Sequence, residues 1–404
     1  MTERQHDVVI VGGGLVGASL AIALARHGTR DVALVEAAPP TAMPAVFDQR
    51  NLSFAAATVN ALGALGVMQK LQAPTGAIRR IHISRQGDFG RVRLDAADYG
   101  RDRFGEVVVA RDFGAALELR LAELPALTRY RPATFVGLAE ADGSTRRLRL
   151  RSETGEQIIG ARLLVAADGT RSAVRDALGI ATQSHDYQQT LFVARVRAEQ
   201  APDGTAYERL TAQGPTALLP RGDRHYGIVH GMPSEQAEAV AALDEASWLA
   251  RLQASVGWRV GRLLSSGERS AYPITRVLAD ALIAQRAVVL GNAAQTIHPV
   301  GAQGFNLGLR DALTLAELIE VADDPGADVL LSHYAARRAE DRQRTLAFSD
   351  GLARLTANPA PLMRPLRSLG MAAIDLSGTL QAYLVGGAMG FRGDVPELCR
   401  EAAA

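Results

Sequence analysis

A glycine-rich turn at residues 12–17 constrains the fold of this chain more than any other feature. The turn reads G-G-G-L-V-G and follows residues 7–11, which predict a short buried strand. Residues 15–27 are mostly small or apolar and predict a helix, and residues 31–35 predict a second strand that ends at Glu36. A strand, glycine turn, helix, strand and acid within about 30 residues are typical of a dinucleotide-binding unit.

The residue types in this unit have physical reasons. Gly12 permits the tight turn, Gly14 lets the backbone approach a pyrophosphate, and Gly17 lets helix and strand pack closely. The N-terminus of the helix would face the phosphates with free N–H groups. Glu36 could accept hydrogen bonds from ribose hydroxyls. The unit fits FAD and NAD equally, so it does not distinguish them.

The same region has an alternative reading as an export or membrane segment. Residues 8–25 form a run of 18 residues without a charge. The preceding residues 3–7 are not positively charged, and three consecutive glycines would weaken a membrane helix. No other segment has the roughly 20 continuous apolar residues that a membrane-spanning helix needs. We therefore expect a cytoplasmic protein.

Composition narrows the class of protein. The chain has 404 residues, of which 48% are apolar and 22% charged, as in a globular protein of two or three domains. The 44 basic and 43 acidic residues nearly cancel, so we expect no nucleic-acid partner. A single cysteine, Cys399, and scattered histidines predict neither an internal disulfide nor a metal site.

Two further motifs select FAD over NAD. Residues 162–175 (RLLVAADGTRSAVR) predict a strand, a turn at Asp168 and a helix. Residues 288–311 (VVLGNAAQTIHPVGAQGFNLGLRD) predict a short strand, a Pro-Gly loop and a long helix. Glycines in that loop let the backbone lie flat against a planar ring, and the helix N-terminus can stabilise negative charge on a reduced flavin. We interpret His298 as a group that orders the loop.

Together the three segments resemble the class A FAD-dependent aromatic hydroxylases, in their ubiquinone-biosynthesis branch. Their order and spacing match over almost the whole chain. The family carries Gly-Asp where this chain has Gly291-Asn292, and Asn can still hydrogen-bond a ribityl hydroxyl. Residues 207–209, 214–220 and 269–273 also resemble that branch.

The resemblance implies an α/β fold, α+β overall, similar to that of para-hydroxybenzoate hydroxylase. A Rossmann-like FAD-binding domain would be interleaved with an antiparallel-sheet substrate domain. We assign residues 1–76, 100–180 and 275–345 to the FAD-binding domain, 77–99 and 181–274 to the substrate domain, and 346–404 to a C-terminal helical region. Residues 190–196, 216–219 and 226–229 predict strands of the substrate domain, and Asp142-Gly143 predicts the turn of a hairpin.

The resemblance also implies which residues bind FAD. The adenosine half would contact Gly12, Gly14, Gly17 and Glu36. The ribityl or pyrophosphate region would contact Asp168 and Asn292. The isoalloxazine would contact Pro299, Gly301, Gly304, Asn306 and Leu307. Polar contacts to the flavin or its phosphates would come from Arg50 and Arg111, each with a surface salt bridge as the alternative.

The residues nearest the chemistry would be the flavin-facing Pro299, Gly301 and Gly304. The sequence names no catalytic acid or base. The phenol pocket would include part of 216–220, with Tyr187 and His230 as further candidates.

The activity implied is that of an FAD-dependent monooxygenase. It would hydroxylate the ring of a polyprenylated phenol in ubiquinone biosynthesis, using O2 and NAD(P)H through a flavin hydroperoxide. NAD(P)H would bind transiently, since no second dinucleotide fingerprint exists. The alternatives are a flavin hydroxylase of another aromatic substrate and a flavin-dependent prenyl-chain reductase.

The C-terminal stretch 359–391 is partly amphipathic and contains Leu366, Leu369, Leu376 and Leu380. It could pack on the FAD-binding domain, or it could dock on a membrane surface or a partner. A polyprenyl substrate needs an exit from the bilayer. Peripheral association with the inner face of the membrane, or with a ubiquinone-biosynthesis complex, therefore stays open.

Overall fold

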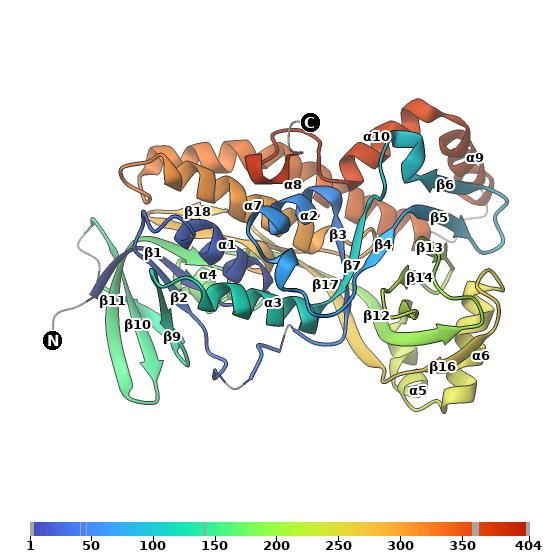
Figure 1. Cartoon of the computed structure of the whole chain (residues 1–404), viewed down its shortest axis with the longest axis horizontal. Coiled ribbons are helices and arrows are strands. Elements are labelled where there is room, and N and C mark those ends of the chain that lie inside the picture. Colours follow the sequence, from blue (N-terminus) through green and yellow to red (C-terminus); the bar gives the residue numbers. More distant parts are fainter. Residues whose placement is uncertain (1–3, 41, 46, 141–142, 358–362, 401–404) are drawn as a thin grey trace.

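Two large sheets and the helices around them form the chain (Figure 1). The structure is a computed structural model, and it describes residues 4–40, 42–45, 47–140, 143–357 and 363–400.

The first large sheet carries the glycine turn. Its central strand β1 (Arg4–Val11) pairs in parallel with β2 (Val32–Val35) and β11 (Gly155–Ala166). Strands β8 (Leu127–Tyr130) and β19 (Ala287–Val289) extend the parallel order on either side, and the short β18 (Ile283–Ala284) closes one edge. The central strands are continuous apolar runs because both faces of the sheet are covered.

Helices cover one face of this sheet and a hairpin covers part of the other. The helices are α1 (Leu15–Ala25), α3 (Ala110–Ala122) and α7 (Gln303–Glu320). The hairpin is formed by β9 (Thr134–Ala139) and β10 (Arg146–Ser152), beside α4 (Ala173–Ala177). The predicted hairpin is thus confirmed, although Asp142 lies outside the described residues.

The second large sheet is antiparallel except where β13 pairs in parallel with β5. Its strands, in chain order, are β5 (Arg80–Arg85), β6 (Arg91–Asp95), β12 (Thr182–Ala198), β13 (Thr205–Leu210), β14 (Pro215–Pro220), β15 (Tyr226–Pro233), β16 (Leu263–Ser266), β17 (Ser270–Ala279) and β20 (Gln295–Thr296). The strands predicted at 190–196, 216–219 and 226–229 are confirmed.

Smaller elements connect and cover the two sheets. A three-stranded sheet consists of β3 (Asn51–Ala55), β4 (Gly76–Ile78) and β7 (Gly105–Val109). The remaining helices are α2 (Ala56–Ala64), α5 (Ala237–Ala241), α6 (Glu245–Val256), α8 (Asp328–Ala357), α9 (Met363–Leu376) and α10 (Gly378–Ala388). Figure 1 shows α9 and α10 at one end of the molecule, near β5 and β6.

This architecture confirms the predicted α/β fold with an interleaved antiparallel sheet. The second sheet draws its strands from residues 80–95, 182–279 and 295–296. Strand β17 crosses the boundary placed after residue 274, and the domain limits themselves stay a prediction. Within the described ranges, no helix combines the length and the apolar character needed to cross a bilayer.

Candidate active site

The glycine turn is too crowded for side chains. Gly12 has φ +107°, and a Cβ atom there would lie 2.4 Å from the carbonyl oxygen of Ala167. A Cβ atom on Gly17 would lie 2.0 Å from the carbonyl oxygen of Gly12. The turn therefore holds β1, α1 and the end of β11 at backbone contact, as the fingerprint predicted.

The start of α1 offers its N–H groups to a ligand. Gly14 precedes the helix with φ −72° and ψ −169°, and no side chain caps the helix. Glu36 follows β2, and its carboxylate accepts hydrogen bonds from the N–H groups of Gly13 (2.8 Å) and Ala38 (2.7 Å). Glu36 therefore lies beside the glycine turn, as predicted from the sequence. Its hydrogen bond to a ribose hydroxyl stays a prediction.

The second motif lies against the first. A Cβ atom on Gly12 would approach the Cα atom of Asp168 to 2.8 Å. The Asp168 carboxylate accepts hydrogen bonds from the hydroxyl of Ser172 (2.5 Å) and the N–H of Val174 (3.1 Å). Asp168 thus stabilises the start of α4 in this structure, and the contact predicted between Asp168 and FAD stays a prediction.

The third motif packs on the first through Val16. A Cβ atom on Gly291 would lie 3.0 Å from a Val16 methyl group, and one on Gly308 would lie 2.9 Å from the same group. Arg175 connects the second and third motifs, because its guanidinium donates to the carbonyl oxygens of Thr170 (3.0 Å) and Ala293 (3.1 Å). Three segments that are far apart in the sequence therefore meet at one place.

The Pro-Gly loop ends in a second uncapped helix. Gly301 has φ +75° and Ala302 has φ +52°, so the backbone turns sharply just before α7. No side chain caps α7, and the side chain of Asn292 and the ring of Pro299 are exposed. With glycine or alanine at residues 301, 302 and 304, this loop leaves backbone surface for a planar ring.

His298 orders the loop. The backbone N–H of Val300 donates to Nδ1 of His298 at 3.1 Å, and Nε2 lies 3.3 Å from the side-chain oxygen of Gln189 on β12. Burial lowers the pKa of His298 to about 4, so the ring is neutral at neutral pH. The loop-ordering role expected for His298 is therefore present in the structure.

Asn306 bonds to the protein through its side chain. Its amide oxygen accepts from the N–H of Ala55 (2.9 Å) and the hydroxyl of Thr58 (2.7 Å), and its amide nitrogen donates to Ser53 and Ala302. Leu307 is buried. The side chains of both residues are thus used internally, so a contact with the flavin would come from the backbone.

The two arginines differ in their surroundings. Arg50 pairs with Asp48 at 2.7 Å and lies over the ring of Tyr272, 4.4 Å from its centroid. Arg111 is exposed at the start of α3. Arg50 thus forms the salt bridge that was the alternative to a flavin contact. Contacts of Arg50 and Arg111 with the flavin stay predictions.

One face of the second sheet is turned toward the FAD motifs. The hydroxyl of Tyr272 on β17 donates to Asp48 at 2.6 Å, and a Cβ atom on Gly227 would lie 2.2 Å from the side chain of Asn51 on β3. Residues that pair directly with Tyr272 or Gly227, and every second residue along the same strands, lie on this face because the side chains of a strand alternate. The face therefore carries the following residues: Leu191, Val193, Ala217, Leu219, Val229 and Gly231.

The prediction of His230 as a pocket residue is wrong. Its Nδ1 lies 2.8 Å from the hydroxyl of Thr216, and its ring packs edge-on against Trp248 of α6. Strand alternation places His230, Thr216 and Leu218 on the face covered by α6, opposite the FAD motifs. Of the predicted 216–220 segment, only alternate residues face the site.

Tyr187 lies beside the Pro-Gly loop. Its ring packs edge-on against His298 with centroids 4.9 Å apart, and its hydroxyl donates to Asp350 of α8 at 2.8 Å. Burial and this hydrogen bond raise the pKa of Tyr187 to about 12. Tyr187 is thus a neutral group that contacts the loop residue before Pro299.

The sequence patterns did not single out Glu208 as a candidate for the site. It lies on β13, on the sheet face that also carries Ala217 and Val229. The signal was present in the alternation of β13, since Tyr207 and Arg209 point to the opposite face.

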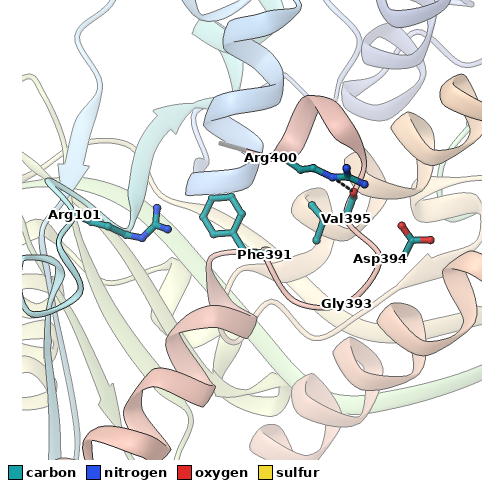
Figure 2. Close-up of a pocket in the computed structure, with 6 residues that line it drawn as sticks. All are labelled: Arg101, Phe391, Gly393, Asp394, Val395 and Arg400. Carbon is teal, nitrogen blue, oxygen red and sulfur yellow. Dashed lines mark hydrogen bonds between the residues drawn. The ribbon is translucent and has the colours of Figure 1, made fainter. Parts of the chain in front are cut away.

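A separate hollow of about 460 Å3 lies near the C-terminus (Figure 2). Its lining residues are Arg101, Phe391, Gly393, Asp394, Val395 and Arg400. The guanidinium of Arg101 lies 4.8 Å from the ring centroid of Phe391, and Arg400 donates to the carbonyl oxygen of Val395 at 3.0 Å. None of the residues predicted to bind FAD lines this hollow, so we do not assign it to the cofactor site.

The assembled cradle fits FAD. Two uncapped helix N-termini, α1 and α7, suit a pyrophosphate and an electron-rich ring, and the glycines before both helices add no side chains of their own. Among the described residues, no group of three or more His, Cys, Asp or Glu side chains could hold a metal ion.

Comparison with known proteins decides the family. A family model described as FAD binding domain matches residues 5–349. The chain belongs to this FAD-binding family. Ubiquinone hydroxylase UbiL of Rhodospirillum rubrum is 34% identical, over 96% of this chain and 90% of its own length. The 3-demethoxyubiquinol 3-hydroxylase of Escherichia coli is 29% identical, over 96% of this chain and 100% of its own length.

Solved structures agree on the fold of this flavoprotein. The p-nitrophenol 4-monooxygenase PnpA of Pseudomonas putida matches with a TM-score of 0.79, covering 97% of this chain and 100% of its own. Its sequence identity is 17%, so this likeness shows the fold alone. Family and homologues together make the protein an FAD-dependent monooxygenase, as the three motifs predicted.

Proposed function

We propose that this flavoprotein hydroxylates the ring of a polyprenylated phenol in ubiquinone biosynthesis, with O2 and reducing equivalents from NAD(P)H. One observation carries the proposal: an assembled FAD cradle faces an apolar sheet, in a chain 34% identical to a ubiquinone hydroxylase over 96% of its length. Bound FAD supplies the activation of O2. The residues of the chain bind and orient the substrate and exclude water.

The apolar sheet face suits a phenol with a hydrocarbon tail. Leu191, Val193 and Ala217 give this face of the sheet an apolar character. Gly227 and Gly231 on β15 let Asn51 and Pro215 pack closely against the strand. Water must be kept out of this space because it would release hydrogen peroxide in place of hydroxylated product. Apolar side chains keep water out and form no hydrogen bonds with the hydroxyl of the phenol.

The ring position is the finer part of the proposal. Residues 207–209, 214–220 and 269–273 resemble those of 2-polyprenyl-6-methoxyphenol hydroxylase, whereas the E. coli relative is named as a 3-hydroxylase of 3-demethoxyubiquinol. We propose a hydroxylase of this group, either for that position or for a neighbouring carbon.

A deletion strain tests the proposal. Under aerobic growth it should accumulate a prenylated phenol that lacks one hydroxyl, and the mass and fragmentation of that compound identify the carbon. Expression of the wild-type chain should restore ubiquinone, whereas the Gly14→Glu variant should not. Normal ubiquinone in the deletion strain would contradict the pathway assignment and leave the hydroxylase class intact.

We further propose that the protein works at the inner face of the membrane and docks through α9. The inner side of α9 packs on β6, where Asp375 accepts from the N–H of Arg93 at 2.8 Å. Its outer side exposes Leu366 (59%), Leu369 (59%) and Leu376 (86%). Apolar side chains on the outside of a terminal helix suit a bilayer surface, where the polyprenyl tail of the substrate resides.

Charge supports the same surface. Arg364 lies at the start of α9 with an exposed side chain that pairs with Asp88 at 3.6 Å, and Arg93 on β6 is exposed beside the helix and pairs with Asp375 at 3.5 Å. Cations at the edge of an apolar patch are attracted to anionic lipid headgroups. Pro359 and Pro361, which precede the helix, lie outside the described residues.

Vesicle binding tests the docking proposal. The holoprotein should sediment with phosphatidylglycerol vesicles, and the triple variant L366Q/L369Q/L376Q should lose most of that binding. The variant V321Q/V329Q is a control, because Val321 and Val329 are exposed apolar residues that lie outside α9. Equal sedimentation of all three proteins, or none by the wild type, would contradict the proposal.

A further inference from the structure

A carboxyl group lies within an apolar row of the second sheet. Glu208 on β13 pairs with Ala217 on β14 and with Ile83 on β5. The row continues through Val229 on β15 to one side and Val92 on β6 to the other. Because directly paired residues share a face, Glu208 is the polar member of a row of alanine, valine and isoleucine.

The side chain of Glu208 lies on the face of the second sheet that packs against β7 and α10. Its neighbour Tyr207 packs into the core around Trp248, on the face covered by α6. Ile83 and Ala206, which share the face of Glu208, pack with Val107 of β7 and Val385 of α10. Glu208 therefore lies on the face of the sheet that also carries Ala217 and Val229, opposite the core around Trp248.

Among the residues that the structure describes, no side chain neutralises this carboxyl. Within the described part of the chain, Glu208 has neither a hydrogen bond nor an ion pair, and its side chain is partly buried. Burial alone raises the pKa of Glu208 to about 7. A partly buried carboxyl without a protein partner is less well solvated than a free one, so its presence in an apolar row calls for a functional explanation.

The other charged groups on this face already have partners. Arg85 of β5 is one row further along, and it lies 3.6 Å from Asp88. Asp88 also lies 3.5 Å from Arg367 of α9. Tyr99, which packs on the same core, donates to Gln381. Glu208 is therefore available to accept a hydrogen bond from a ligand.

We infer that Glu208 binds the phenolic hydroxyl of the substrate and accepts its proton during ring hydroxylation. The inference rests on the proposed function and adds a named substrate-binding group to it. A phenol brings one O–H donor into an otherwise apolar space, and Glu208 is the acceptor that the sheet presents there.

The proton step balances without another reactant. The carboxylate of Glu208 accepts the hydrogen bond from the phenolic O–H. As the ring is oxygenated, that O–H bond breaks, the proton forms a new O–H bond on the Glu208 carboxyl, and the electron pair stays on the phenol oxygen. The negative oxygen raises electron density at the ortho and para carbons, and the Glu208 proton returns to water after product release.

A comparison of two ligands distinguishes a substrate-binding role of Glu208 from a purely structural one. The probes are a short-chain ortho-prenylated phenol and its methyl ether, which lacks the phenolic proton. Binding to the FAD-loaded protein is followed by the change in flavin absorbance for wild type, Glu208→Gln, Glu208→Leu and the control Tyr207→Phe on the opposite face. Tm is measured for all four proteins.

We expect the phenol to bind about 10-fold to 100-fold more weakly to Glu208→Leu, as for loss of a hydrogen bond to a charged group. Glu208→Gln should weaken binding less, because its amide oxygen still accepts from the phenol but carries no charge. The methyl ether should bind wild type and Glu208→Leu within about threefold of each other. Hydroxylation by the wild type should fall as pH drops through about 7, and Glu208→Gln should lack this step. The control Tyr207→Phe should match the wild type.

Two failures are distinguishable. If the wild type hydroxylates the phenol but Glu208→Gln binds it equally and keeps the pH step near 7, the assignment of Glu208 is wrong and the proposed function stands. If the FAD-loaded wild type neither binds nor hydroxylates the phenol, the proposed substrate class is wrong, and the role of Glu208 falls with it.

Discussion

The backbone N–H of Val300 donates a hydrogen bond to Nδ1 of His298 at 3.1 Å, directly before the two glycines of the Pro-Gly loop. This bond requires an unprotonated Nδ1, so protonation of His298 removes the acceptor that holds the loop. Ser349 on α8 donates to the carbonyl oxygen of His298 at 2.8 Å and fixes the residue from the other side. The shape of the loop thus depends on a neutral histidine.

Stability should therefore fall in acid because of His298. Its pKa is about 4 in the folded chain against 6.5 as the ordinary value, so the unfolded chain binds more protons between these limits. The Tm of the wild type should drop as pH falls from about 6.5 to about 4. In His298→Gln, which cannot titrate, this part of the drop should be missing. An identical pH dependence of Tm in both proteins would falsify the role given to His298.

Two glycine substitutions should separate cofactor binding from folding. Gly14 has backbone angles open to any residue, so Gly14→Glu should fold while losing FAD, because its carboxylate occupies the pyrophosphate site. Gly17→Ala should fail to fold stably, since the new Cβ would lie 2.0 Å from the Gly12 oxygen. Flavin absorbance and circular dichroism of the purified variants measure the two effects. Retained FAD in Gly14→Glu would contradict the fingerprint.

Much of the fold followed from local pattern. The glycine turn requires its strand and helix around it. The segments predicted as strands at 190–196 and 226–229 became parts of β12 and β15, and most side chains of these segments are buried on both faces. The three motifs predicted a common site, and Val16 packs on Gly291 and Gly308 as such a site demands.

Orientation across the second sheet was harder to predict. The side of the sheet that faces FAD depends on long-range pairing, in which Tyr272 donates to Asp48 across 224 residues of sequence. Without knowledge of this long-range contact, the sequence could not show that His230 and Glu208 lie on opposite faces of the sheet. The internal bonds of Asn306 were likewise invisible in the sequence, since they join α7 to β3 and α2.

Removal of the Asn306 side chain should destabilise the protein. Asn306→Ala leaves the buried N–H of Ala55 and the hydroxyl of Thr58 without their acceptor. We expect the free energy of unfolding to fall by about 2–4 kcal/mol, as for two lost buried hydrogen bonds. Urea unfolding measures the loss, and Asn60→Ala, whose bonds are 3.3–3.4 Å long and partly exposed, is the control. Equal effects of the two substitutions would contradict this account.

Substitution of Glu208 should raise stability. Its pKa is about 7 in the folded chain against an ordinary 4.5, so the folded chain binds more protons between these values and stability falls as pH rises through them. Glu208→Leu should therefore have a higher Tm than the wild type at pH 7.5, and the difference should shrink toward pH 4.5. A lower Tm for Glu208→Leu at pH 7.5 would indicate that the carboxyl has a structural partner.

The arrangement of β1, β11 and α7 has a consequence for biosynthesis of the protein. The glycine turn is translated first, yet the strand beside it ends at Ala166 and the helix that packs on Val16 begins only at Gln303. On the ribosome the nascent chain must emerge past residue 303 before the three motifs can meet. Chains released early would expose the apolar β1 and α1 with no cofactor to hold them, so the supply of FAD matters at the end of synthesis.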